Sequence, residues 1–184
     1  MEDNNQANDP AVPYNKPLDF DQVWQLFQET NKKFKETDKK IKELASLFTS
    51  QWGKLIESLV EGDLIKLLNG RGIKVERTLQ RMKGNREGQN FEYDIVAVNN
   101  TDIVIVEVKT TLRPQDVSDF HEKLWKAKQF MPEYKEMTIY GGVAFLTAEG
   151  ASDRMAEKIG LFTIKATGSS ASISNSEDFK PKAF

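Results

Sequence analysis

Apolar residues recur every three, four or seven positions between residues 18 and 52, and charged residues of both signs fill the intervening positions. This spacing predicts one long amphipathic helix. Its apolar stripe consists of Phe20, Val23, Trp24, Phe27, Phe34, Ile41, Leu44, Leu47 and Phe48. A sustained stripe opposite a charged face is typical of a coiled coil, whereas a helix packed on the chain's own core would leave the Lys-rich middle unsupported. We therefore expect a coiled-coil-like arm through which the chain forms homo-oligomers, in a number that the pattern does not determine.

The helical period continues after Gly53, and the apolar stripe becomes wider, as is expected for a helix that lies against a sheet. Asn69, Gly70 and Gly72 predict the end of this helix. Gly62 lies inside it, where a glycine costs about 1 kcal/mol relative to alanine. We therefore expect another part of the structure to approach closely at Gly62.

A period of two replaces the helical period after Gly72. Residues 73–77 are expected to form the start of the first strand, and a turn-rich connection follows at residues 83–88. Two β-rich segments, residues 91–98 and 103–109, flank four residues whose composition indicates a hairpin loop. The pattern therefore predicts three consecutive strands after the helix.

Helical and strand patterns alternate in the rest of the chain. Pro114 predicts the start of a helix, residues 138–147 a buried strand, residues 152–158 a short helix and residues 161–166 a final strand. The order is thus helix, three strands, helix, strand, helix, strand. This order indicates an α/β fold with a mixed sheet.

Composition divides the chain into four parts. Residues 1–17 are polar and rich in proline, so we expect a disordered tail. Residues 18–52 form the coiled-coil-like arm, and residues 53–166 form the α/β core. Residues 167–184 are Ser-rich and are expected to be irregular, although two phenylalanines there can attach this segment to the core.

The sequence contains no cysteine and one histidine, His121. This excludes disulfides, thiolate metal sites and a His-rich zinc site within one chain. A bound metal ion would be held by oxygen ligands, which favours Mg²⁺ or Mn²⁺. The sequence shows no apolar secretory signal and no apolar segment of membrane-spanning length, so we expect a cytoplasmic protein. The net charge of −2 argues neither for nor against nucleic-acid binding.

Two ionisable side chains, Glu107 and Lys109, lie two positions apart at the end of an otherwise apolar strand and therefore share one face of it. Burying a charge costs on the order of several kcal/mol unless it is paired or bound to metal. Seen alone, the two residues fit an inert, solvated ion pair as well as they fit a functional site.

Asp94 on the neighbouring strand changes this balance. A four-residue hairpin loop places Asp94 opposite Glu107, and a two-residue loop places it diagonally on the same face. In either register the two Cβ atoms are roughly 5–8 Å apart, close enough for both carboxylates to hold one divalent cation.

Residue Glu61 and the segments 91–96 (FEYDIV) and 106–109 (VEVK) together resemble the PD-(D/E)xK nuclease superfamily. The likeness is to its Holliday-junction-resolvase-like branch and to uncharacterised bacterial proteins with a coiled-coil prefix, and it covers roughly residues 53–166. Tyr93 stands where the family name has proline. The resemblance implies a restriction-endonuclease-like αβββαβ core with a mixed sheet, preceded here by the long helical arm.

By this resemblance, Asp94 and Glu107 bind the metal ion, and Lys109 positions or activates the attacking water. A glutamate on the preceding helix often completes such a site, which makes Glu61 the fourth catalytic residue and a further candidate metal ligand. Glu57, one helical turn earlier, is the reserve candidate. The backbone carbonyl of Val108 is a suitable supplementary ligand, because hard cations accept such oxygens. For both glutamates the alternative is an exposed acid on an amphipathic helix.

A basic segment lies next to these residues in the sequence. Six basic side chains and one acidic side chain, that of Glu76, occur within residues 71–86. The expected nucleic-acid contacts are Arg71, Lys74, Arg77, Arg81, Lys83 and Arg86. Such a segment suits contacts to phosphates, although a solvated basic loop explains it nearly as well. His121, Lys123, Lys126 and Lys128, on the helix after Pro114, are expected to face water.

These features together predict a Mg²⁺- or Mn²⁺-dependent endonuclease that hydrolyses phosphodiester bonds, with DNA favoured over RNA. The alternative is a non-catalytic module that keeps the nuclease fold for nucleic-acid binding or for coiled-coil-mediated assembly.

Overall fold

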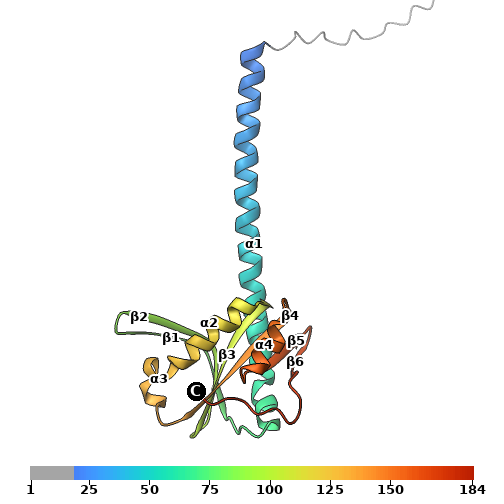
Figure 1. Ribbon diagram of the computed structural model, residues 1–184. Coiled ribbons are helices and arrows are strands. Elements are labelled where there is room, and N and C mark those ends of the chain that lie inside the picture. Colours follow the sequence, from blue (N-terminus) through green and yellow to red (C-terminus); the bar gives the residue numbers. More distant parts are fainter. Residues whose placement is uncertain (1–18) are drawn as a thin grey trace, which may run out of the picture. The chain divides into compact units, whose positions relative to one another are not determined.

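The computed structural model describes residues 19–184, so the tail expected at residues 1–17 lies outside the described residues (Figure 1). Helix α1 (Phe20–Gly70) is continuous over 51 residues. It contributes to both compact units into which the chain divides, residues 1–45 and residues 46–184. The long N-terminal helix is therefore confirmed. No helix within residues 19–184 is long and apolar enough to span a membrane.

The second unit is built on one six-stranded sheet with the order β1-β2-β3-β4-β5-β6. Its strands are β1 (Arg77–Arg86), β2 (Gln89–Val98), β3 (Asp102–Leu112), β4 (Thr138–Ala148), β5 (Phe162–Thr167) and β6 (Ser170–Ile173). Strand β4 is parallel to β3 and to β5, and the other neighbouring pairs are antiparallel. The predicted α/β class with a mixed sheet is confirmed.

Helices cover both faces of this sheet. Between β3 and β4 lie α2 (Pro114–Trp125), α3 (Ala127–Phe130) and the 3-10 turn η1 (Pro132–Tyr134), and α4 (Ser152–Lys158) precedes β5. Helices α2 and α4 pack on one face (Figure 1), where the core cluster includes Val117, Phe120 and Ala156. The end of α1 packs on the other face through Ile56, Val60, Leu64 and Leu68, one residue per turn. The expected αβββαβ order is therefore present, followed by α4, β5 and β6.

Two strand predictions were wrong in their limits. Strand β1 begins at Arg77 rather than Ile73, and it continues through residues 83–86, which were expected to be a loop. Ile73 and Val75 are buried in an irregular connection after α1, so their alternation arises from packing without strand pairing. The hairpin turn is shorter than expected and falls at Glu87 and Gly88, which both have positive φ.

The C-terminal segment is more ordered than the Ser-rich sequence indicated. Strand β6 pairs with β5, and the Asp63 carboxylate accepts a hydrogen bond from the backbone N–H of Ala171 at 2.8 Å. The expected attachment by phenylalanines is confirmed. Phe179 packs against Phe162 with 5.5 Å between ring centroids, and the N–H of Phe184 donates to the carbonyl of Ile139 at 2.9 Å. Residues 170–184 are therefore attached to the core at several points, although most of them are exposed.

The expectation of a close approach at Gly62 was wrong, because a Cβ added there would meet no atom within 4 Å. Gly141 in β4 is the tight position. A Cβ at Gly141 would lie 2.3 Å from Cδ1 of Leu124 and 2.7 Å from Cδ2 of Leu161. This close packing between α2 and β4 explains the glycine.

We predict that Gly141→Ala lowers the free energy of unfolding by about 1–3 kcal/mol, because the added methyl group overpacks the core. Gly62→Ala is the matched control and should raise the free energy of unfolding by up to about 1 kcal/mol, because it removes glycine from an open helical position. Urea unfolding followed by circular dichroism measures both. An equal change in the free energy of unfolding for the two variants would contradict the close packing at Gly141.

Candidate active site

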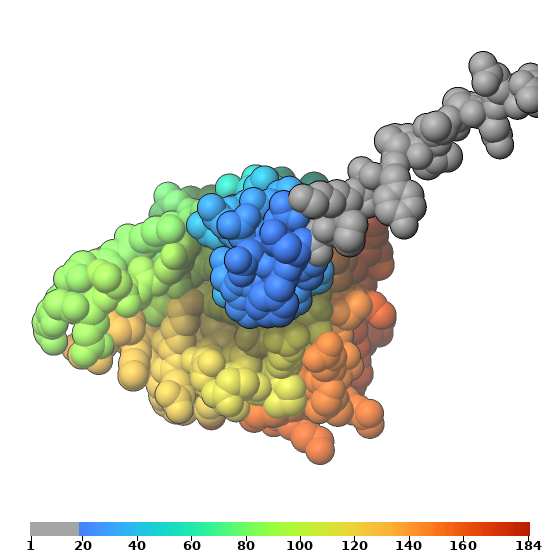
Figure 2. Space-filling view, turned by 90° about the horizontal axis from the view of Figure 1, so that it is seen from above, coloured from blue at the N-terminus to red at the C-terminus, as the bar shows by residue number. Residues whose placement is uncertain are grey.

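The sheet forks at the level of Asp94 and Glu107. Strand β2 pairs with β3 only through Ile95–Val98, and its earlier residues pair with β1 alone. Strand β3 continues past Val106 in pairing with β4. The β1–β2 hairpin consequently diverges from β3 in Figure 1, and it projects from the body of the core in Figure 2. The register matches the four-residue hairpin loop, which places Asp94 at the level of Glu107.

The alternation of side chains along β2 is interrupted at this fork. Ile95 packs on the α1 side of the sheet and Val96 on the α2 side. Regular alternation would put Tyr93 on the α1 side, but Tyr93 packs in the α2-side cluster. Arg81, at the matching level of β1, has a φ of 49°. Asp94 therefore lies where the regular alternation of β2 is interrupted, at the level of the fork.

The carboxylate of Asp94 enters the gap between the diverging strands. Its Oδ2 accepts a hydrogen bond from the backbone N–H of Val108 at 2.7 Å. Burial, and then the negative charge of Glu107, raise the pKa of Asp94 to about 6 against the opposing effects of the Val108 hydrogen bond and Lys123. Asp94 and Glu107 thus interact electrostatically, as the sequence predicted.

Glu107 is held by two ammonium groups. Its Oε1 lies 3.1 Å from Nζ of Lys109, and its Oε2 lies 2.7 Å from Nζ of Lys123. Lys109 also lies 3.8 Å from Oδ1 of Asp116 on α2. Burial alone would lower the pKa of Lys109, but the neighbouring acids, Glu107 foremost, raise it above its usual value. Lys109 is therefore a cation within this cluster.

The position of Lys123 contradicts the expectation that it faces water. Its Nζ contacts Glu107 and also lies 5.0 Å from the ring centroid of Tyr93. The Tyr93 side chain is buried, and its hydroxyl has no hydrogen-bond partner among the described residues. Burial, and then the charge of Glu107, raise the pKa of Tyr93 to about 12. The sequence carried one usable signal, since Lys123 follows Phe120 by three positions and so lies on the sheet-facing side of α2.

Glu61 and Glu57 face β1. Glu61 accepts hydrogen bonds from the hydroxyl of Thr78 at 2.8 Å and from the amide of Gln80. Glu57 binds the guanidinium of Arg81 through two contacts of 2.9 and 3.1 Å. Within residues 19–184 there is no group of three or more His, Cys, Asp or Glu side chains that could hold a metal ion. The structure therefore brings together Asp94 and Glu107, and it places Glu61 outside that pair.

The basic segment is divided between internal contacts and free surface. Arg71 donates to the backbone carbonyls of residues 175 and 176, Arg81 pairs with Glu57, and Lys83 lies 3.0 Å from Oε1 of Glu92. The remaining cations are Lys74, Arg77 and Arg86, which are exposed and for which the described residues provide no side-chain ion pair. Half of the predicted nucleic-acid contacts thus already serve the chain's own structure.

His121 packs inward rather than facing water, which corrects the expectation. Its ring lies 5.6 Å from that of Phe184 and 6.2 Å from that of Trp125. Burial, followed by the nearby charge of Lys182, lowers the pKa of His121. The sequence could not show this contact, because it depends on the return of the chain end to α2.

Oxygen donors of the type that hard divalent cations bind lie at the fork, but among residues 19–184 they do not form a group of three acidic side chains. Asp94 and Glu107 supply carboxylate oxygens. Val108 lies between Glu107 and Lys109 on β3, and its backbone carbonyl is a further oxygen donor. Burial is the main cause of the raised pKa of Asp94, and repulsion from Glu107 adds to it. A cation between the two carboxylates would relieve that repulsion. Asp94, Glu107 and the Val108 carbonyl are the groups that could hold a cation, and the ammonium group of Lys109 lies beside Glu107.

Neither protein-family models nor curated proteins match this sequence. Two solved structures are similar to it. One is the crystal structure of a repair endonuclease from Pyrococcus abyssi, with 24% identity, 58% of this chain and 46% of that chain covered, and a TM-score of 0.40. The other is the crystal structure of a protein of unknown function, with 14% identity, 54% and 53% covered, and a TM-score of 0.40. This chain spans about half the length of each.

We predict that Asp94→Asn raises the free energy of unfolding at pH 7 by about 1–2 kcal/mol in EDTA. The pKa of Asp94 is about 6 in the folded protein, against 3.8 as its ordinary value. Between these values the folded state holds a proton that the unfolded state has released, so this carboxyl makes the protein less stable as the pH rises. The difference between variant and wild type should vanish below pH 4.

The exposed carboxylate of Asp119 on α2 provides the control, and Asp119→Asn should leave the pH profile unchanged. Urea unfolding between pH 4 and pH 8 measures both variants. A loss of stability in Asp94→Asn at pH 7 would show that the charged carboxylate stabilises the fold, contrary to this account.

Proposed function

We propose that this chain is a Mg²⁺- or Mn²⁺-dependent nuclease that hydrolyses phosphodiester bonds, with DNA as the favoured substrate. One observation carries the proposal: Asp94, Glu107 and Lys109 meet at the fork of the sheet, where two acids interact beside an ammonium group. Burying such a set is costly, and a solvated surface pair would not require a broken strand alternation.

The cation would be held by Asp94, Glu107 and the backbone carbonyl of Val108. When bound, such an ion neutralises the phosphate charge and lowers the pKa of a bound water. To bind the ion, Glu107 must give up its contact with at least one of its two lysine partners. Its two partners differ in origin, because Lys109 lies on the same strand and Lys123 comes from α2.

The two lysines have separate roles in this proposal. Lys109 lies between Glu107 and Asp116 and can donate a hydrogen bond to the attacking water or to the developing charge on the phosphate. Lys123 is held by the Tyr93 ring and by Glu107. It keeps the Glu107 carboxylate oriented toward the fork and offsets its charge.

The projecting β1–β2 hairpin is the surface that we propose for nucleic acid (Figure 2). Arg77 and Arg86 are exposed at its two ends, and such cations bind phosphates without selecting a sequence. A cytoplasmic setting and association with further copies of this chain through residues 20–52 belong to the same proposal.

A non-catalytic module that keeps this fold for binding or assembly is the second candidate. The observation that favours it is the full pairing of Glu107, whose two oxygens each contact a lysine. Within residues 19–184 no group of three or more acids or histidines could hold a metal ion, and Glu61 and Glu57 are engaged with side chains of β1.

We predict that the protein cleaves DNA with Mn²⁺ or Mg²⁺ and that EDTA abolishes the cleavage. Glu107→Gln and Lys109→Met should each reduce the rate roughly 10²–10⁴-fold, the usual contribution of a group that takes part in proton transfer. Plasmid, branched and single-stranded substrates are incubated with each protein, and the products are resolved on gels.

The matched controls are Glu122→Gln and Lys126→Met, which make the same chemical changes at exposed positions of the same region and should cleave like wild type. Mn²⁺ binding is measured separately by calorimetry with Asp94→Asn, which should weaken it at least tenfold. Nucleic-acid binding that persists in EDTA without cleavage by wild type would instead support the non-catalytic module.

We further predict that Arg77→Gln combined with Arg86→Gln weakens DNA binding and reduces the slope of log K against log salt by about 2, one unit per lost phosphate contact. Arg154→Gln combined with Lys158→Gln on α4 removes the same charge and should leave the slope unchanged. Fluorescence anisotropy in EDTA over a range of salt concentrations measures both. Equal slopes for the two double variants would place the nucleic acid elsewhere.

A further inference from the structure

Large apolar side chains lie every seventh residue along the first part of α1. Phe20, Phe27, Phe34, Ile41 and Phe48 have 80%, 61%, 75%, 60% and 63% of their surface exposed in the single chain. A strict seven-residue repeat keeps these side chains on one seam only if helices supercoil around each other. This row defines the a positions of a heptad, and Val23, Thr30, Thr37 and Leu44 occupy the d positions.

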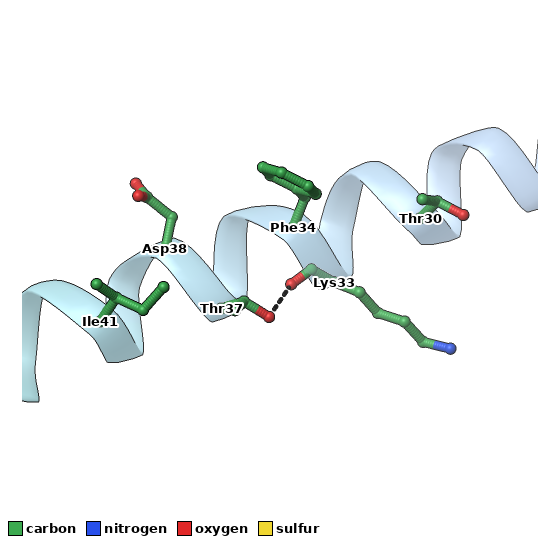
Figure 3. Close-up of a pocket in the computed structure, with 6 residues that line it drawn as sticks. All are labelled: Thr30, Lys33, Phe34, Thr37, Asp38 and Ile41. Carbon is green, nitrogen blue, oxygen red and sulfur yellow. Dashed lines mark hydrogen bonds between the residues drawn. The ribbon is translucent and has the colours of Figure 1, made fainter.

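A shallow pocket lies on this seam within the first unit (Figure 3). It is lined by Thr30, Lys33, Phe34, Thr37, Asp38 and Ile41. In heptad terms these are the d, g, a, d, e and a positions. The hydroxyl of Thr37 donates to the backbone carbonyl of Lys33 at 2.8 Å, so the polar group is satisfied within its own helix. The methyl group of Thr37 then remains for packing.

These six residues correspond to two consecutive holes of a parallel coiled coil. In a parallel, in-register pair, an a side chain of one helix enters a hole formed by d, g, a and d of the other. Here that hole consists of Thr30, Lys33, Phe34 and Thr37. The next hole receives a d side chain and consists of Phe34, Thr37, Asp38 and Ile41. The pocket is the union of the two holes, so it fits Phe34 and Thr37 of a second copy.

Charges along the seam select the same orientation. A parallel pair places each g residue beside the e residue five positions later in the other helix. Lys33 would therefore meet Asp38 of the second copy. Asp38 already lies 2.8 Å from Nζ of Lys42 in its own helix, and its exposed carboxylate can accept a second cation. An antiparallel pair would instead bring g residues together, including Lys33 and Lys40, with like charges opposed.

We infer that copies of this chain associate in parallel and in register through the a and d positions of residues 20–48. The inference specifies the self-association included in the proposed function, and it is independent of the metal and of cleavage. Because the core follows the arm in the sequence, both chains of such a pair continue into their cores from the same end of the coiled coil.

The test uses the absence of cysteine from the sequence. Thr30→Cys and Thr37→Cys each introduce one thiol at a d position, and Lys39→Cys places a control thiol at the opposite f position. Each protein is oxidised in EDTA at micromolar concentration, and disulfide formation is followed on non-reducing gels. Both d-position variants should cross-link roughly a hundredfold faster than Lys39→Cys, because a neighbouring thiol has a millimolar effective concentration.

Each alternative arrangement gives a different result. In an antiparallel pair, equivalent residues of the two chains meet only at the level of the two-fold axis. At most one of the two d-position variants could then cross-link rapidly, and that result would overturn the inference. Cross-linking of neither variant above the control rate would overturn self-association as well. Phe34→Lys provides a second measurement, since like charges at an a position should reduce the mass in solution to the 21.0 kDa of one chain. An unchanged mass for this variant would also overturn the inference.

These outcomes are distinguishable from failure of the nuclease proposal. Cross-linking is measured without metal or nucleic acid, so a chain that cross-links at both d positions but never cleaves DNA supports the parallel pair and removes the nuclease. A protein that cleaves DNA but does not cross-link would support the nuclease proposal and overturn the parallel pair.

Discussion

The end of pairing between β2 and β3 is the constraint on which the site depends. Up to Ile95 and Val106 the two strands are joined by a regular antiparallel ladder. Beyond this level β2 pairs only with β1, and β3 pairs only with β4. Ladder atoms that part must find new partners, and the N–H of Val108 finds the Asp94 carboxylate. The same contact that closes the fork therefore fixes one acid beside the other.

Charge balance at this fork comes from three elements. Glu107 and Lys109 belong to β3, Asp94 to β2 and Lys123 to α2. A half-buried glutamate without these cations would be strongly destabilising, and two lysines without it would repel each other. The cluster is thus an ion-pair network, and burial together with the charge of Glu107 raises the pKa of Asp94 within it. In the proposed function, a bound cation would offset the negative charge of Asp94.

Much of this arrangement was predictable from local patterns. The period of two, the apolar frame and the hairpin loop limited the pairing of Asp94 and Glu107 to two registers, because strand register follows from loop length. The structure has the register of the four-residue loop. Lys123 was assigned to the wrong side of α2, since a long charged side chain on a helix is usually solvated. Glu61 was assigned by resemblance, and its contacts with Thr78 and Gln80 depend on where α1 crosses β1. No periodicity in a single segment carries that information.

The sequence alone determined the order of the elements, the heptad row on α1 and the two acids with a lysine on adjacent strands, because each follows from short-range spacing along the chain. Tertiary structure decided which basic side chains remain exposed, how the fork opens and which helix supplies the second ammonium group. It also decided that residues 170–173 form a strand and that His121 meets Phe184. These outcomes depend on contacts between residues far apart in the chain, whose partners are set by the packing of whole helices on the sheet rather than by neighbouring residues.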